Sequence, residues 1–230
     1  ALSLAIDRED FAQNVLKDGS IEANGFVPED LSKGPNGEDF REDAKDFTTY
    51  DANAAQEALN QALQELGKSE VTLRLLYGTD ESPMDTMATY LQNAVTKLDG
   101  LNIEMVATTK QDRIYNKEAN GDFDLACTRW GPDYGDPTTY LYLMKTGNNN
   151  NYGKWSNEQY DALLNQINTE LDVQKRWDLM LQAEELAMND YANIPVFQKG
   201  NTALLNPKVK DLVNQQVGTP FTFKYVYKEG

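Results

Sequence analysis

The chain has 230 residues, with 37 acidic and 21 basic side chains and no histidine, so its formal charge at pH 7 is −16. This acidity argues against nucleic-acid binding through a basic patch, and the lack of histidine excludes His-based triads and imidazole metal sites. The single cysteine, Cys127, excludes an internal disulfide and a multi-thiolate zinc site. No apolar run reaches the roughly 18 residues that a membrane span needs.

The first part of the chain is predicted to be helical. Apolar spacing starts at Ala1, and the turn composition of residues 18–20 ends the helix near Lys17. No N-cap residue precedes this helix, which indicates that the chain is an excised piece of a longer one. Residues 21–50 are rich in glycine, proline and charge, and we expect a long surface loop there.

A strong helix signal follows this loop. Asp51 is a typical N-cap and Gly67 a typical C-terminal stop. The spacing i, i+3, i+4, i+7, i+8, i+11 between them predicts one apolar face. Its members are Ala55, Ala58, Leu59, Ala62, Leu63 and Leu66.

Residues 71–129 alternate between predicted strands and helices. The strands are 71–77, 101–107 and 123–129, and the helices are 83–98, with Ser82 as N-cap, and 109–119. Strands joined through helices pair in parallel with right-handed crossovers. The sequence therefore predicts an α/β fold, a mostly parallel sheet flanked by helices.

Two more helices and several extended pieces complete the chain. Ser156 with Gln159 forms a capping box that predicts one helix. Asp172 is the predicted N-cap of the next, whose apolar stripe is Val173, Trp177, Met180, Leu181, Ala187 and Met188. Residues 194–197 are an extended apolar run, and strands are expected at 203–205 and 221–227.

The candidate site is the segment from Thr128 to Pro137, which follows directly on a predicted buried strand. Open α/β folds bind ligands at this carboxyl edge of the sheet. Trp130 offers a flat apolar surface, and Asp133 offers a carboxylate that only accepts hydrogen bonds. Together they suit a ligand that carries an ammonium group beside an apolar one.

Plainer interpretations exist for the same residues. Trp130 is also typical of a core cap at a strand end, and Asp133 and Asp136 are typical turn residues beside glycine and proline. The two aspartates also permit a carboxylate-based glycosidase or a calcium site, although the further ligands that calcium needs are not visible. Cys127 is predicted to be a small buried hydrophobe, because no histidine base is present to activate it.

Four collinear segments resemble one known family. Residues 129–141 resemble the W-x-x-D-Y-x-D-P…L signature of the extracytoplasmic peptide-binding proteins of ABC importers, solute-binding family 5. The other segments are residues 1–8 (A-L-x-x-A-I-D-R), residues 155–161 (W-x-N…Y-D) and residues 176–196 (R…A-E…I-P). The resemblance spans nearly the whole chain, although family members are about twice as long.

The resemblance implies one lobe of a two-lobed fold of the periplasmic-binding-protein type II-like class. Residues 1–197 would be the C-terminal ligand-binding lobe, and residues 198–230 a return segment toward the N-terminal lobe. It implies peptide capture without catalysis or a cofactor, delivery to membrane permease subunits, and a monomer. The location implied is extracytoplasmic, either periplasmic or lipid-anchored through a missing N-terminus.

The resemblance also assigns roles to residues. Asp133 would hold the peptide α-amino group, Trp130 would line a side-chain pocket with Tyr134 beside it, and the backbone of Thr128, Arg129 and Trp130 would pair with an extended peptide. Some family members carry an arginine where this chain has Cys127, and strand alternation points Arg129 to the other side. The partner of a peptide C-terminus is therefore not assigned, and an oligosaccharide, a nickel chelate or a pheromone peptide remains an alternative cargo.

Overall fold

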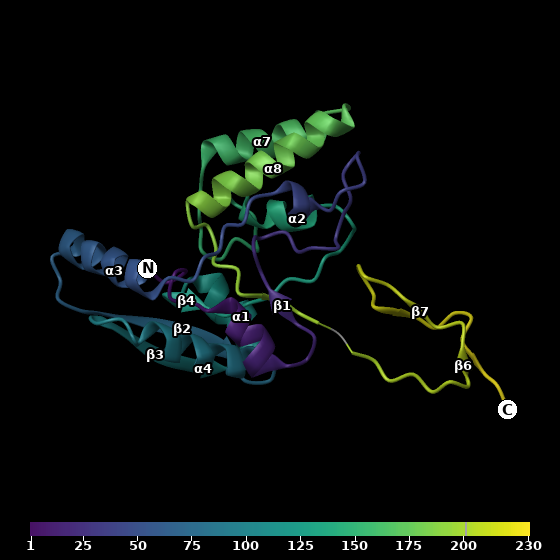
Figure 1. Cartoon of the computed structure of the whole chain (residues 1–230), viewed down its shortest axis with the longest axis horizontal. Helices are drawn as coiled ribbons and strands as arrows, with labels where there is room; N and C mark the ends of the chain where they lie inside the picture. Colours follow the sequence, from purple (N-terminus) through teal and green to yellow (C-terminus); the bar gives the residue numbers. More distant parts are fainter. Residues whose placement is uncertain (201) are drawn as a thin grey trace.

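The computed structural model describes residues 1–200 and 202–230 and is shown in Figure 1. Its helices are α1 (Arg8–Asp10), η1 (Phe11–Leu16, π-helical), α2 (Phe40–Asp43), α3 (Ala52–Leu66), α4 (Met84–Val95), α5 (Lys110–Asp112), η2 (Arg113–Glu118, π-helical), α6 (Thr138–Leu141), η3 (Tyr142–Met144, 3-10), α7 (Glu158–Thr169) and α8 (Val173–Asn189). Its strands are β1 (Ile21–Glu22), β2 (Val71–Gly78), β3 (Leu101–Thr108), β4 (Leu125–Ala126), β5 (Phe197–Gln198), β6 (Val209–Lys210), β7 (Val213–Asn214), β8 (Phe221–Thr222) and β9 (Tyr227–Lys228).

The central sheet is parallel, with strand order β3-β2-β4. Strand β2 pairs along its whole length with β3, from Val71 opposite Leu101 to Gly78 opposite Thr108, and pairs with β4 on its other side. The predicted α/β class with a parallel sheet is confirmed. All three strands point their carboxyl ends to the same edge, where the candidate segment begins.

One hydrophobic cluster packs around this sheet. It joins α3, α4, η1 and the strands through Ala5, Phe11, Ala55, Leu59, Leu63, Leu75, Met84, Met87, Ala88, Val95, Leu98, Leu101, Ile103 and Cys127. Asp51 accepts hydrogen bonds from the backbone of Asn53 and Ala54, and Gly67 ends α3 at a φ of 63°, so both predicted ends of α3 are confirmed. The predicted apolar face is one residue too long, because Leu66 in the last turn is 60% exposed.

A second hydrophobic cluster lies under α7 and α8, in the upper part of Figure 1. Its buried members are Val27, Phe40, Tyr140, Leu141, Leu143, Met144, Tyr160, Leu164, Ile167, Trp177, Met180, Ala183 and Ala187. The prediction of a surface loop over residues 21–50 is wrong in part, since Val27 and Phe40 are fully buried in this cluster. The predicted stripe of α8 also starts too early, because Val173 in its first turn is exposed.

A buried ion pair fixes the 21–50 segment to α8. Glu184 on α8 accepts hydrogen bonds from the backbone of Phe26 (2.9 Å) and Val27 (2.8 Å) and pairs with Arg41. Any side chain at Gly25 would overlap the Arg41 guanidinium. The pair therefore explains why a glycine-containing segment enters the core at this point.

The start of the first helix differs from the prediction. The helix begins at Arg8, and its N-cap is Asp7, whose side chain accepts from the backbone of Asp10. Residues 2–5 form a turn instead. The predicted absence of an N-cap is thus wrong. The predicted end is confirmed, since Lys17 is left-handed with a φ of 53°.

Two predicted caps are displaced. Asn157, not Ser156, caps α7 by accepting from the backbone of Gln159 and Tyr160, while Ser156 contacts the Thr146 hydroxyl. Pro83 takes the N-cap position of α4, and no side chain caps that helix, so the role predicted for Ser82 is wrong. Helix α4 also ends at Val95, before the predicted Leu98.

The third predicted strand is much shorter than residues 123–129. Only β4 pairs as a strand, although the backbone N–H of Cys127 still donates to Leu76 (2.8 Å). Upstream, both Asp124 oxygens bind Arg74. Downstream, the chain leaves β2 and Trp130 packs against the second cluster. The strand is therefore limited to the residues between these two anchors.

The last part of the chain extends away from both clusters (Figure 1). Strands β6 and β9 pair, as do β7 and β8, each with two residues per strand. The strand predicted at 203–205 is absent among the described residues, and Leu204 is fully exposed. The single strand predicted at 221–227 is wrong, because the pairing is broken into β8 and β9 and the residues Phe223 and Tyr225 between them are exposed.

The predicted boundary between residues 197 and 198 falls inside β5, which pairs with β1. The backbone N–H of Gly200 also donates to the Ser20 hydroxyl (3.0 Å). Asn201, within the predicted return segment, lies outside the described residues. The division into a lobe and a return segment stays a prediction.

Candidate functional site

The candidate segment leaves the carboxyl edge of the sheet with the backbone N–H groups of its first three residues unpaired in the described structure, while further along the Pro132 carbonyl accepts from the backbone N–H of Gly218 (2.9 Å). Among residues 1–200 and 202–230, no hydrogen-bond acceptor meets the backbone N–H groups of Thr128, Arg129 or Trp130. The Trp130 carbonyl accepts a hydrogen bond from the Tyr140 hydroxyl (3.3 Å). Open backbone at the end of an edge strand is what an added strand needs for pairing.

Trp130 is partly buried and partly exposed. Its ring is half-buried against the second cluster, which agrees in part with the core-cap interpretation. Its indole N–H is buried, and no acceptor among the described residues meets it. A buried donor without a partner is costly, so this position favours a ligand or water that accepts a hydrogen bond.

Asp133 is exposed, and the structure leaves its carboxylate without a hydrogen bond or ion pair in the described part of the chain. Its backbone N–H donates to the Thr139 hydroxyl (3.1 Å), which holds the loop against α6. Tyr134 beside it is 45% exposed. The turn interpretation therefore does not account for the Asp133 side chain. This carboxylate faces solvent three residues after Trp130 in the sequence.

Asp136 has a different environment. Its oxygens accept from Arg176 (2.7 and 3.1 Å) and from the hydroxyl and backbone of Thr138 (2.5 and 3.0 Å). Burial raises the pKa of Asp136, but these hydrogen bonds outweigh burial and hold the pKa below its ordinary value. The turn interpretation is confirmed for Asp136. Because its carboxylate is occupied, the glycosidase alternative loses one of its two acids.

We expect this pair to make stability pH-dependent in the acid range. A carboxyl group whose pKa is lower in the folded state stabilises the fold above its ordinary pKa, about 3.9, and loses that contribution as the pH falls through the lower folded value. Denaturant unfolding of wild type and Asp136→Asn should thus differ most near neutral pH and converge in strong acid. A constant difference at all pH values would contradict the pairing.

A buried charge network beneath the segment was not predicted from the sequence. Arg113 is almost fully buried and donates to Glu81 (2.6 and 3.2 Å), Glu118 (2.5 Å) and the Thr128 hydroxyl (2.9 Å). Burial lowers the pKa of Arg113, but the two carboxylates reverse this effect. Burial raises the pKa of Glu118, and the attraction of Arg113 opposes that rise.

Arg129 and Cys127 flank Thr128 and differ sharply. Arg129 is exposed and donates to the carbonyl of Ser82 (3.0 Å), so it contacts the loop after β2. Cys127 is buried, and burial raises the pKa of its thiol to about 12. The prediction that Cys127 is a buried hydrophobe is confirmed.

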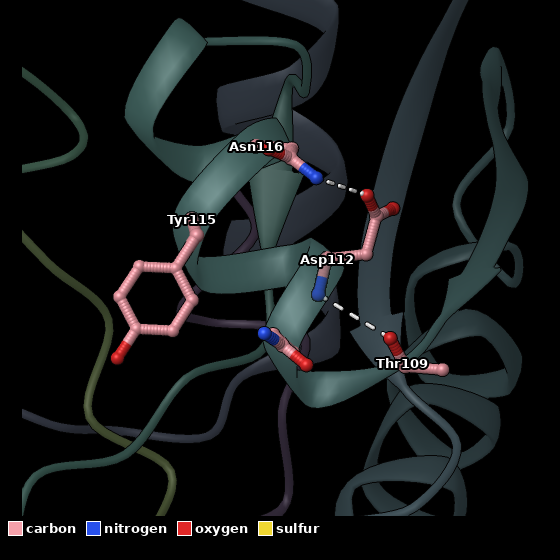
Figure 2. Close-up of a pocket in the computed structure, with 5 residues that line it drawn as sticks. Thr109, Asp112, Tyr115 and Asn116 are labelled. Atoms are coloured by element: carbon pink, nitrogen blue, oxygen red, sulfur yellow. Dashed lines mark hydrogen bonds between the residues drawn. The ribbon is translucent and has the colours of Figure 1, made fainter.

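Two surface cavities lie away from the candidate segment. One of about 320 Å³ is lined by residues of α5 and η2, and Figure 2 shows its Tyr115 ring pointing away from the Asp112 carboxylate. The other, of about 330 Å³, lies between residues 5–10, the start of α3 and the end of α4. Neither is lined by residues 128–134, and within that segment Thr128, Arg129 and Asp133 are exposed.

In the described ranges, no three His, Cys, Asp or Glu side chains are grouped to hold a metal ion. None of the helices described is both long and apolar enough to cross a membrane.

Comparison with known proteins places this α/β lobe in the class of solute-binding proteins. Residues 1–152 match the profile of the bacterial extracellular solute-binding proteins, family 5 (middle part). The chain therefore belongs to this family, as the four sequence segments predicted.

Individual relatives agree with this assignment. A dipeptide-binding protein of Lactococcus lactis is 34% identical over 99% of this chain and 42% of its own length. The crystal structure of a peptide-binding protein of a peptide ABC transporter is 33% identical, with a TM-score of 0.81, and the match covers 86% of this chain and 88% of the other. The structure of Listeria monocytogenes OppA bound to peptide is 33% identical with a TM-score of 0.89, over 100% of this chain and 44% of the other.

The chain spans about two fifths of the length of the curated relatives it matches most strongly. The family and the α/β lobe are thus established by these matches. The cargo, the partners and the roles of individual residues are properties of the whole protein, and they are proposed in the next subsection.

Proposed function

We propose that the chain is the C-terminal lobe of a peptide-capturing protein of an ABC importer and that it performs no catalysis. Residues 1–197 form the lobe, and residues 198–230 return toward the N-terminal lobe. The whole protein works as a monomer outside the cytoplasm, periplasmic or lipid-anchored, and delivers peptide to the permease subunits. Similarity to proteins named for dipeptide and peptide binding supports this proposal.

The observations that carry the proposal are the backbone N–H groups of residues 128–130 and, later in the same segment, the Asp133 carboxylate, all without a partner among the described residues. An extended peptide pairs with such a backbone through main-chain hydrogen bonds, which are independent of the peptide sequence. The indole ring of Trp130 covers a neighbouring apolar side chain, with Tyr134 beside it. Asp133 accepts charge-assisted hydrogen bonds from the terminal ammonium group.

The open form of the site fits a lobe that closes on its ligand. Residues 128–129 and 133–134 are exposed, so the proposed peptide contacts are reachable from solvent. A second lobe placed against it encloses the peptide by hinge motion, and desolvation then strengthens the contact between Asp133 and the ammonium group.

Calorimetry on the full-length protein tests this function. We expect a mixture of short unmodified peptides to bind with a dissociation constant of micromolar order or tighter, and we expect at least 100-fold weaker binding of an oligosaccharide or a nickel chelate. Trp130→Ala should weaken peptide binding by about 1–3 kcal/mol through lost aromatic contact. Saccharide binding without peptide binding would overturn the peptide assignment while leaving the family intact.

A further inference from the structure

The Thr128 side chain accepts a hydrogen bond from an almost fully buried charge, the guanidinium of Arg113. Arg113 lies on η2, yet its guanidinium reaches the loop after β2 through Glu81 and the segment after β4 through Thr128. Its third partner, Glu118, lies at the end of η2. One planar side chain thus joins three pieces of chain at the carboxyl edge of the sheet.

The network carries more negative charge than one arginine neutralises. Oxygens Oε1 of Glu81 and Oε2 of Glu118 are buried, and neither has a hydrogen-bond donor among the described residues. The ammonium of Lys110 lies 3.4 Å from Glu81, and the guanidinium of Arg129 lies 3.9 Å from it. The two carboxylates therefore hold Arg113 in place strongly, because moving it would leave both without their main counter-charge.

Thr128 is the point where this rigid network meets the open backbone. The hydroxyl of Thr128 is the acceptor for Arg113, while the backbone N–H of the same residue is without an acceptor in the described structure. Beyond Cys127, the segment has lost its pairing with β2. At Thr128, the hydrogen bond between the side chain and Arg113 therefore holds the segment, because pairing with the sheet has ended.

We propose that Arg113 is a positioning residue, which holds the segment Thr128–Trp130 in the extended conformation that receives the ligand backbone. Glu81 and Glu118 are the counter-charges that keep its guanidinium aimed at Thr128. This role rests on the proposed function, since it concerns how that same site is preorganised. A preorganised backbone binds more tightly because less conformational entropy is lost on binding.

The test removes only the link between Arg113 and Thr128. Thr128→Val in the full-length protein keeps the side-chain shape but removes the acceptor, and Arg113 keeps both carboxylates. Thr128→Ser restores the hydroxyl. Thr79→Val is the matched control, because the Thr79 hydroxyl at the end of β2 donates to the Thr108 carbonyl (3.2 Å) and takes no part in the network.

Two readouts are measured, peptide affinity by calorimetry and the backbone order parameters of Arg129 and Trp130 by NMR relaxation without ligand. For Thr128→Val we expect about five- to tenfold weaker peptide binding. We also expect the order parameters to fall from about 0.85, typical of rigid backbone, toward about 0.6. Thr79→Val should stay within about twofold of wild type in affinity, and Thr128→Ser should recover most of the affinity that Thr128→Val loses.

The outcomes separate this proposal from the function on which it rests. Unchanged order parameters in Thr128→Val would overturn the positioning role, even if affinity falls, because the hydroxyl would then act by direct contact. A lower melting temperature with unchanged order and affinity would overturn it as well. If the wild-type protein binds no peptide, the proposed function fails, while the order parameters of the free protein still decide the role of Arg113.

Discussion

Glu184→Ala is expected to lower the free energy of unfolding by about 3–5 kcal/mol, because it leaves a nearly buried arginine without its counter-charge. Glu184 has no exposed surface, and it is also the acceptor for the backbone N–H groups of Phe26 and Val27. The substitution would leave those two donors unpaired in the core and add to the loss. Chemical denaturation followed by circular dichroism measures the change.

A neighbouring glutamate provides the control. Glu185 pairs with Lys45 at the surface, where the Lys45 side chain is largely exposed and the Glu185 side chain partly exposed. Glu185→Ala should stay within about 0.5 kcal/mol of wild type, since surface pairs contribute little. Glu184→Gln should fall between the two, because its amide oxygen still accepts from the backbone of Phe26 and Val27. Equal effects of Glu184→Ala and Glu185→Ala would contradict the buried pair.

The second large effect concerns the charge of the peptide N-terminus. In the full-length protein, acetylating the α-amino group of a bound peptide is expected to weaken binding by about 2–5 kcal/mol, the scale for breaking an enclosed charge pair. Asp133→Asn should weaken binding of the free peptide by a similar amount. Both changes remove the same contact, so the two together should cost little more than either alone.

Calorimetry of the four combinations measures this coupling. A peptide amidated at its C-terminus serves as the control, since it keeps the free ammonium group that Asp133 is proposed to hold. If acetylation costs as much in Asp133→Asn as in wild type, Asp133 is not the partner of the ammonium group. Peptide binding itself could then still hold through the backbone of Thr128–Trp130.

Much of the fold is predictable from local patterns. The sequence predicts the ends of helix α3 and of strands β2 and β3 within about one residue, because periodicity and caps agree there. Only the apolar face of α3 is predicted one residue too long, at Leu66. The cap of α7 was misplaced by one residue, since Ser156 and Asn157 are both good N-caps and only the structure decides between them. The C-terminal aromatic residues alternate like a strand, but alternation alone does not supply a partner strand or a core.

The candidate segment was found from sequence, but its supports were not. Glu81 and Arg113 are 32 residues apart, and Asp136 and Arg176 are 40 residues apart. No sequence spacing predicts such contacts, because they arise only when the sheet and α8 are assembled. Arginine and glutamate are mostly exposed in folded proteins, so the sequence alone predicts a surface position for these buried residues. The sequence therefore does not distinguish the two aspartates of one motif, although Asp136 is paired and Asp133 has no side-chain partner in the described part of the chain.

Arg8, in the first of the four segments, also has a structural contact that the sequence does not predict. It is buried without a carboxylate partner among the described residues and donates to the carbonyl of Pro195 (2.7 Å), so the first sequence segment is joined to the last. Burial lowers the pKa of Arg8 to about 10. Two of the four segments that resemble the family thus contact each other through the hydrogen bond between Arg8 and Pro195.

The ion pair between Asp136 and Arg176 has a consequence for how such proteins are recognised. Two of the four segments that resemble the family contribute one residue each to this pair, which joins α8 to the candidate segment. A descendant that exchanged Asp133 for a neutral residue would keep the rest of its fingerprint and still be grouped with peptide carriers. If Asp133 holds the peptide ammonium group as proposed, sorting these proteins by what they transport should weigh this position above the rest of the signature.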